Sequence, residues 1–131
     1  MFIGNCFILY SIMSSLHLGN VQHVQEPTPQ IIKTYTNIPE INNWVSVPLG
    51  TEEVTIYVKA KNTETMLFWL VPTGTATWKE RKLLGYDTNG TDGWSLKWNI
   101  KGKVLHNHIH VQALGYTSIS NDLINISSEL K

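Results

Sequence analysis

Between Val54 and Ala60 the sequence reads VTIYVKA, in which apolar and polar residues alternate without interruption. A period of two is typical of a strand that buries one face, so Val54, Ile56 and Val58 are predicted to point into a core. Similar short runs follow at close intervals, separated by residues that favour turns. From Trp44 onward the chain is therefore predicted to be all-β, and no segment after residue 20 has convincing helical periodicity.

The remaining predicted strands are short and are bounded by turn residues: 65–71, 82–87, 94–99, one within 104–115, and 121–127. In the turn TNGTDG, the pairs Asn89-Gly90 and Asp92-Gly93 supply residues that tolerate positive φ. Trp94 and Trp98 alternate with polar residues and are predicted to face the core. These segments are the inventory expected for an immunoglobulin-like β-sandwich of about seven antiparallel strands.

Length and charge narrow the possible partners. With 131 residues the chain has room for one domain with a core plus a short appendage. Ten Lys and Arg residues balance ten Asp and Glu residues. This balance provides no basic surface for nucleic acid and no polybasic patch for anionic lipid, so neither is expected as a partner.

The first 20 residues, MFIGNCFILYSIMSSLHLGN, are apolar and then become small and polar. This length fits the apolar region of a signal peptide and is short for a membrane span, although the usual basic residues before the run are absent. A cleaved signal peptide, a retained membrane anchor and a folded first element are the alternatives. Contact with a membrane is expected only through this segment, if it is not cleaved. Cys6 is the only cysteine, which excludes an intramolecular disulfide.

Residues 21–43 contain Pro27, Pro29 and Pro39 and show little apolar periodicity. Proline removes backbone donors and favours extended chain, so this segment is predicted to be a linker. Within it, Ile31–Tyr35 could still pair as an edge strand. The predicted organisation is a signal-peptide-like or anchoring segment at 1–20, a linker at 21–43 and a sandwich domain at 44–131.

Three runs of the sequence carry a family resemblance: VTIYVKAKNTETMLFWLVPTG, KLLGYDTNGTDGWSLKWNI and HIHVQALG. A strand ending in alanine leads to an apolar strand at Met66–Leu70. The pair Leu84-Gly85, near an aspartate, precedes the aromatic strand Trp94–Trp98, and a later strand carries alternating aliphatic residues into alanine. In these features the chain resembles the bacterial immunoglobulin-like domains of secreted and cell-surface proteins, over about residues 44–127.

The resemblance rests on packing and turn positions, so it implies a fold more than a ligand. Two departures from the family pattern are Met66, where a β-branched aliphatic residue is usual, and a longer loop from Pro72 to Arg81. Membership would imply a spacer, adhesive or accessory module in an exported protein. It would not imply an enzyme.

Three histidines, His106, His108 and His110, occupy alternate positions in VLHNHIHVQALG. If the aliphatic residues of this strand face the core, the three histidines and Gln112 point to the outer face of the sheet. Alternate strand positions lie about 6.6 Å apart, so two neighbouring imidazoles could share one Zn²⁺ but all three could not. The neighbouring strands offer no good zinc ligand. The three histidines are therefore weak metal candidates, and a solvated or partner-facing surface is the simpler interpretation.

The predicted outer face is unusually apolar for a solvated surface, since Leu67, Trp69, Val71 and Leu123 are expected beside His108 and His110. Three interpretations are open: an interface within or between molecules, a linker that folds back over the face, and a flat glycan-binding surface that uses Trp69. Trp78, in the polar loop TATWKERK, is a further exposed aromatic residue that could touch a ligand or cap the end of the sandwich.

No catalytic constellation is visible in the sequence, because no nucleophile has a local base and no glycine-rich phosphate loop is present. The protein is therefore expected not to be an enzyme and to need no cofactor. The leading hypothesis is an exported binding, spacer or accessory module at the bacterial surface, with an unidentified protein or a cell-wall polysaccharide as partner. The alternative hypothesis is a ligand-binding domain for cell-wall glycan or a divalent metal, using the Trp and His residues of the outer face.

Overall fold

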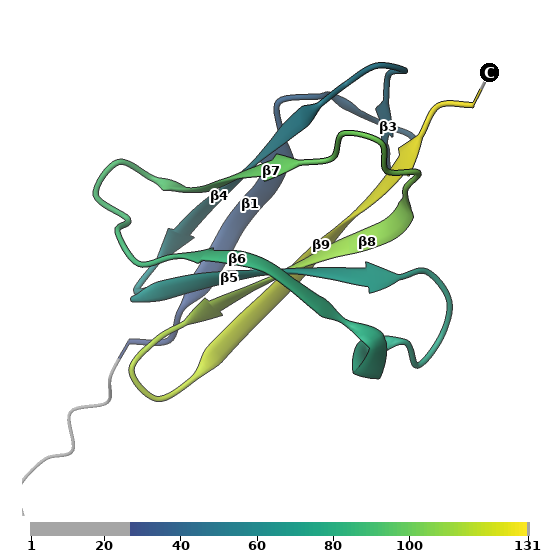
Figure 1. Ribbon diagram of the computed structural model, residues 1–131. Helices are drawn as coiled ribbons and strands as arrows, with labels where there is room; N and C mark the ends of the chain where they lie inside the picture. Colours follow the sequence, from purple (N-terminus) through teal and green to yellow (C-terminus); the bar gives the residue numbers. More distant parts are fainter. Residues whose placement is uncertain (1–26, 131) are drawn as a thin grey trace, which may run out of the picture.

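The computed structural model describes residues 27–130, which form a two-layer β-sandwich (Figure 1). Its elements in chain order are β1 (Gln30–Thr36), β2 (Glu40–Ile41), β3 (Trp44–Val47), β4 (Glu53–Lys61), β5 (Thr65–Pro72), the 3-10 turn η1 (Trp78–Glu80), β6 (Lys82–Asp87), β7 (Trp94–Asn99), β8 (His106–Leu114) and β9 (Ile119–Ser128). The segment 1–20, with its predicted signal peptide or anchor and Cys6, lies outside the described residues. Within 27–130 there is no helix with the length and apolar character needed to span a bilayer.

One sheet has the strand order β1-β4-β7, and the other has the order β2-β3-β9-β8-β5-β6. The chain passes from one sheet to the other after β1, β3, β4, β6 and β7, and such repeated crossing between two packed sheets is typical of immunoglobulin-like sandwiches. The predicted all-β, immunoglobulin-like sandwich is confirmed. Two details differ from the prediction of about seven antiparallel strands: the described chain has nine strands, and β3 pairs with β9 in parallel, with Val45 opposite Ile126.

The folded part begins earlier than the predicted boundary at Trp44. Strand β1 pairs with β4 over its whole length, as the edge-strand alternative for Ile31–Tyr35 anticipated. Pro29 is buried, and a Cβ at Gly115 would collide with its ring, so the chain is fixed to the domain before β1 starts. The chain then crosses to the other sheet around Pro39, which is why the two halves of the predicted linker pair with different sheets.

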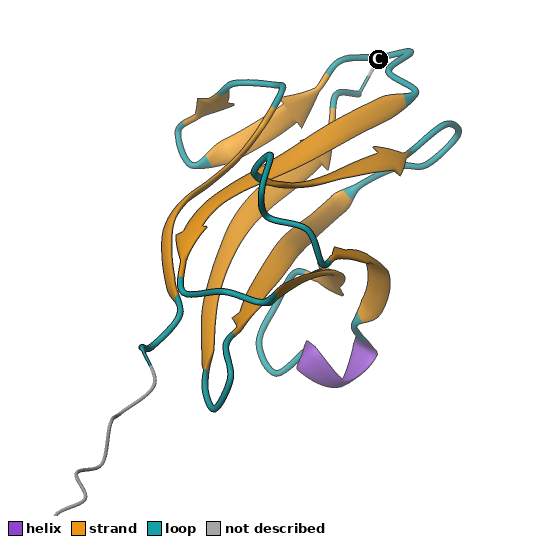
Figure 2. Ribbon diagram, turned by 90° about the vertical axis from the view of Figure 1, so that its left-hand side faces the viewer, coloured by secondary structure: helices purple, strands orange, loops and turns teal. Residues whose placement is uncertain are grey.

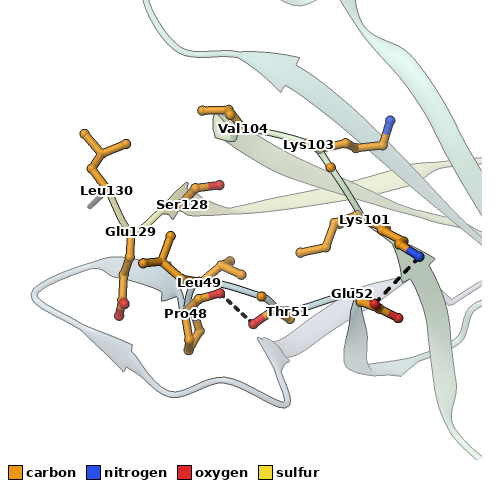
Figure 3. A pocket seen from close by; sticks show the side chains of 14 residues that line it. Pro48, Leu49, Thr51, Glu52, Lys101, Lys103, Val104, Ser128, Glu129 and Leu130 are labelled. Atoms are coloured by element: carbon orange, nitrogen blue, oxygen red, sulfur yellow. Dashed lines mark hydrogen bonds and ion pairs between the residues drawn. The ribbon is translucent and has the colours of Figure 1, made fainter.

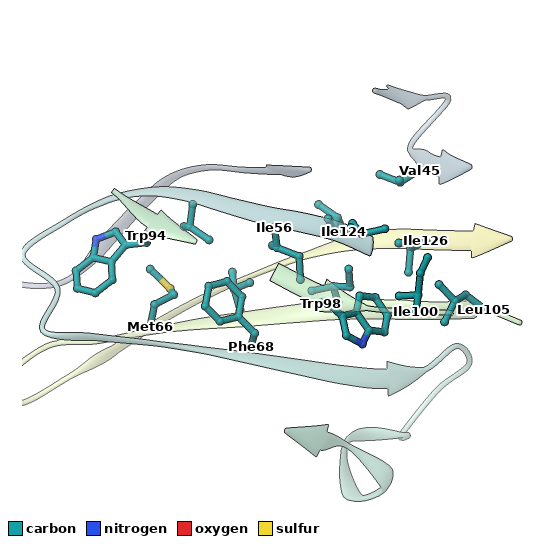
Figure 4. Close-up of a cluster of buried hydrophobic side chains, with 14 of the residues drawn as sticks. Val45, Ile56, Met66, Phe68, Trp94, Trp98, Ile100, Leu105, Ile124 and Ile126 are labelled. Carbon is teal, nitrogen blue, oxygen red and sulfur yellow. The ribbon is translucent and has the colours of Figure 1, made fainter. Parts of the chain in front are cut away.

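The core lies between the two sheets and contains both tryptophans that were predicted to face inward (Figure 4). Trp94 and Trp98 are 8% and 6% exposed, while Ile56 and Phe68 are completely buried. Met66, the departure from the family pattern, is also completely buried and lies near Trp94 in the core (Figure 4). The period-two patterns therefore identified the buried faces of β4, β7 and β8 correctly.

The loop between β6 and β7 uses its two glycines for different reasons. Gly93 has φ of 92°, as expected for a residue chosen for left-handed backbone. Gly90 does not, but a Cβ on it would collide with the indole ring of Trp94. The carboxylate of Asp87 accepts backbone N–H groups of Asn89 and Ser95, each at 3.0 Å, and so holds both ends of the loop.

Candidate functional site

The outer face of the six-stranded sheet is built around the histidine strand β8. His110 lies between Trp69 of β5 and Leu123 of β9, and His108 lies between Val71 and Asn125. These are the neighbours that the strand order predicted. Ile109 and Val111, at the intervening positions, are completely buried. Because successive side chains of a strand point to opposite faces, the histidines point away from the core.

Trp69, Trp78 and His110 form an aromatic cluster on this face. The ring centroids of Trp69 and Trp78 are 5.7 Å apart in an edge arrangement, and those of Trp78 and His110 are 4.6 Å apart. Trp78 reaches the cluster because the loop after β5 turns back over the sheet and ends in η1, seen as the purple turn in Figure 2. Thr77 Oγ1 donates to the carbonyl of Pro72 at 2.7 Å and closes this loop.

Arg81, which follows η1, completes one side of the aromatic cluster. Its guanidinium carbon lies 4.9 Å from the ring centroid of Trp69 and 4.4 Å from that of Trp78. Its Nη1 donates to the carbonyl of Trp78 at 3.1 Å, which fixes the guanidinium over the rings. Such cation–π contacts are worth about 0.5–1 kcal/mol each at exposed sites. The cluster is thus partly covered by a residue of its own loop.

A row of amides borders the aromatic cluster at Trp69 and His110. Trp69 Nε1 donates to Gln112 Oε1 at 2.7 Å, and Gln112 Nε2 donates to Asn121 Oδ1 at 3.1 Å. The same Asn121 oxygen lies 3.1 Å from His110 Nε2. Sequence parity identified Gln112 as outward-facing but missed Asn121 and Arg81, because their positions depend on the β8–β9 register and on the path of a loop.

The three histidines have separate partners. His106 stacks on Trp44 with ring centroids 5.0 Å apart, whereas His108 Nδ1 lies 2.7 Å from Asn125 Oδ1. His110 contacts Trp78 and Asn121 as described above. In the portion 27–130, no three His, Cys, Asp or Glu side chains gather in a way that would hold a metal ion. Each of the three imidazoles of β8 therefore contacts its own amide or aromatic neighbour, and no two of them share a site.

The exposed apolar area lies nearer the edge of the sheet than expected. Val71 was predicted to belong to the interaction surface, but it is only 5% exposed and so offers no contact area. Leu123 is 45% exposed, and on the edge strand β6 Leu83 and Tyr86 are 45% and 63% exposed. The part of the predicted linker that is described pairs in the other sheet or at the far edge. The segment that covers the face is the loop after β5.

A separate pocket of about 350 Å³ lies at one end of the sandwich, between the β3–β4 turn, the β7–β8 loop and the end of β9 (Figure 3). Its rim carries the exposed apolar side chains of Leu49, Val104 and Leu130. Several of its polar side chains already have partners, since Thr51 Oγ1 donates to the carbonyl of Pro48 and Lys101 pairs with Glu52 at 3.9 Å. The other charged side chains of its lining, Lys103 and Glu129, are exposed, so few fixed polar groups converge on this pocket and it is the weaker candidate.

In comparisons with known proteins, no family model matches the chain and no curated protein is significantly similar to it in sequence. The immunoglobulin-like architecture therefore rests on the strand order described above. The resemblance to bacterial immunoglobulin-like domains remains an expectation.

Proposed function

We propose that the protein is a non-catalytic binding module, exported to the bacterial cell surface as a bacterial immunoglobulin-like domain, and that it binds a partner through the aromatic cluster. The observation that supports this proposal is the convergence of Trp69, Trp78 and His110 on one outer face. They come from β5, η1 and β8, and they are not part of the buried core. Large side chains that serve no core and remain partly exposed commonly mark a site of interaction.

The chemistry of the cluster supports binding rather than catalysis. Its polar groups are the guanidinium of Arg81, the imidazole of His110 and the amides of Gln112 and Asn121, which form hydrogen bonds with one another or with the backbone. Neither a carboxylate nor a hydroxyl or thiol nucleophile belongs to this set. His110 is a possible base, but nucleophilic catalysis also needs such a nucleophile within hydrogen-bond reach of that base. The same groups are suited to recognition by hydrogen bonds and ring contacts.

A protein is the partner that the composition of the face favours. Tryptophan, tyrosine and arginine are enriched at the energetic centres of protein interfaces. In addition, Arg81 lies over both indole rings, so one side of each ring is unavailable to a stacking sugar. A cell-wall polysaccharide is the second candidate, favoured by the amides of Gln112 and Asn121 beside Trp69, which are groups that hydrogen-bond to sugar hydroxyls.

Binding of the purified full chain to cell-surface protein extract and to purified cell-wall polysaccharide tests both candidates. Trp78→Ala is expected to abolish binding to the true partner. Arg81→Ala is expected to weaken protein binding, but to strengthen polysaccharide binding by freeing the rings. Tyr57→Ala is the matched control, because Tyr57 stacks on Tyr35 on the other sheet at 5.2 Å. Equal binding by wild type and Trp78→Ala would refute the proposed site.

The path of the chain supports a spacer role alongside binding. The start of β1 and the end of β9 lie at opposite ends of the long axis of the sandwich (Figure 1). A domain that the chain enters at one end and leaves at the other can hold its neighbours apart.

Fractionation of cells and sequencing of the mature amino terminus test the proposed export of the protein. Recovery only from the cytosol with an intact amino terminus would refute it.

A further inference from the structure

Strand β6 is an open edge of the six-stranded sheet. It pairs with β5 on one side, and within 27–130 no strand pairs with its other side. Open edges present unpaired backbone groups that can accept another strand, and proteins usually protect them with charges or by covering them. Charged residues stand only at the two ends of β6, Lys82 and Asp87, and between them the edge carries Leu83 and Tyr86, which are 45% and 63% exposed. The edge is therefore suited to pairing with another strand, and the sequence of β6 indicates which strand that is.

The sequence of β6, KLLGYD, is complementary to itself in antiparallel pairing. When two copies are paired about the midpoint between Leu84 and Gly85, Lys82 of each copy lies opposite Asp87 of the other. In the same register Leu83 lies opposite Tyr86. Opposite charges and aromatic–aliphatic pairs directly across two strands each contribute about 0.2–1 kcal/mol. Both kinds of pair occur twice, as two-fold symmetry requires.

The face on which these side chains lie also fits. Residues 83 and 86 would point to opposite faces of a regular strand, because three positions separate them. A bulge in the β5–β6 pairing shifts the register, so that Leu83 is opposite Trp69 and Tyr86 is opposite Leu67, both on the outer face. Gly85 is opposite the buried Phe68 on the inner face. In the self-paired register, outward residues therefore meet outward residues.

The other two long edge strands, β1 and β7, lack this complementarity. Strand β7 carries a single charged residue, Lys97, so two β7 strands cannot pair opposite charges. Strand β1, an edge of the three-stranded sheet, also carries an exposed apolar residue, Ile32, at 54% exposure. Antiparallel pairing of two β1 strands about their midpoint would place Lys33 of one copy directly opposite Lys33 of the other. Like charges in directly opposed positions are destabilising. Charge complementarity thus distinguishes β6 from β1 and β7.

We propose that β6 pairs in antiparallel with β6 of a second copy of this chain, joining two six-stranded sheets into one continuous sheet. Because Leu83 is the β6 neighbour of Trp69, the two aromatic clusters then lie on the same face of the joined sheet. The paired strands are only six residues long, so the contact is small and the dimer is expected to be weak and dependent on concentration. Self-association is independent of the binding function proposed above.

Sedimentation of the full chain over micromolar to near-millimolar concentrations is the first test, with circular dichroism to verify folding. We expect a monomer–dimer equilibrium that Leu83→Lys and Tyr86→Lys each abolish. Ile119→Lys is the matched control, because Ile119 is 54% exposed on β9, away from the edge, and should leave the dimer intact. A wild-type chain that is monomeric throughout would overturn the proposal, as would a dimer that neither β6 substitution weakens.

Cross-linking tests the register in a Cys6→Ser background, which removes the only native thiol. Chains carrying Leu83→Cys, mixed with chains carrying Tyr86→Cys, are expected to form an interchain disulfide on mild oxidation. Either variant alone should cross-link poorly, because equal residues of the two copies are offset by about 10 Å along the strand, beyond disulfide reach. Cross-linking of the single variants at the rate of the mixture would overturn the proposed register.

Discussion

Trp78 packs against His110 with ring centroids 4.6 Å apart, although Trp78 belongs to η1 and His110 to β8, one of the two central strands of the larger sheet. This contact shows that the loop after β5 does not cap the end of the sandwich. It lies on the outer face and brings Arg81 with it. The surface that the alternating pattern of β8 predicts is thus completed by a segment without any periodic pattern.

Substitutions of Thr34 and Thr36 in β1 show how much a buried hydroxyl group changes the free energy of unfolding, with and without a hydrogen-bond partner. Both are 8% exposed, but Thr34 Oγ1 finds no hydrogen-bond partner within residues 27–130. Thr34→Val exchanges this hydroxyl for a methyl group of the same shape. We expect it to raise the free energy of unfolding by about 1 kcal/mol, because the buried hydroxyl no longer has to be desolvated. Urea unfolding followed by tryptophan fluorescence measures the change.

Thr36→Val is the control for that substitution and is expected to have the opposite sign. Thr36 Oγ1 donates to the carbonyl of Ile38 at 2.8 Å and accepts its N–H at 3.0 Å, so it closes the turn after β1. Loss of both bonds should lower the free energy of unfolding by about 1–2 kcal/mol. If both substitutions changed stability in the same direction, the unpaired state of Thr34 Oγ1 would be disproved.

Ala76 has φ of 57°, which lies in the left-handed region that residues with a Cβ adopt at a cost. Ala76→Gly removes that cost but adds freedom to the unfolded chain, and we expect a net gain of about 0.5 kcal/mol in the free energy of unfolding. Ala60→Gly is the control, because Ala60 lies within β4 at ordinary strand geometry and should lose about 1 kcal/mol. Thermal unfolding of both variants distinguishes the two signs. A loss at position 76 equal to that at position 60 would contradict the expectation.

Alanine substitutions at Gly90 and Gly85 test whether the side chain next to each glycine can move to make room for a Cβ. A Cβ at Gly90 would collide with the rigid indole of Trp94, which is 8% exposed, whereas a Cβ at Gly85 would lie 2.7 Å from the Cδ1 of Leu96, a flexible side chain. Gly90→Ala is therefore expected to cost about 1–3 kcal/mol, and Gly85→Ala clearly less. Denaturant midpoints rank the two variants. The reverse order would mean that the β6–β7 loop yields more readily than the Leu96 side chain.

The sequence predicted the parts of this fold that depend on local alternation. The inward faces of β4 and β8 follow from their period of two, and so does the outward direction of the three histidines. The pattern did not fix β1, because seven residues next to proline carry too few buried positions, although pairing with β4 stabilises them as a strand. Val71 was misjudged because parity states which face a side chain points to but not what covers that face.

The candidate site was predictable only in part, for a related reason. Trp69, Trp78 and His110 were each identified from sequence, but nothing local indicates that η1 folds onto β5 and β8. Asn121 precedes the buried half of β9 and joins Gln112 only through the hairpin register. Such contacts between distant segments are set by tertiary packing, which a single sequence read by local pattern does not contain.

Trp78 and Trp98 provide the sharpest test of the division between surface and core. Trp78 is 37% exposed and contacts Trp69, His110 and Arg81, so Trp78→Ala should lose these contacts and about 1–2 kcal/mol of stability. Trp98 is 6% exposed within the core, and Trp98→Ala should leave a cavity and cost about 3–5 kcal/mol. Guanidinium unfolding followed by circular dichroism avoids interference from the lost fluorophore. If the two substitutions lowered the free energy of unfolding equally, Trp78 would be a structural residue that the domain needs for packing. That result would contradict the interpretation of the aromatic cluster as a binding surface.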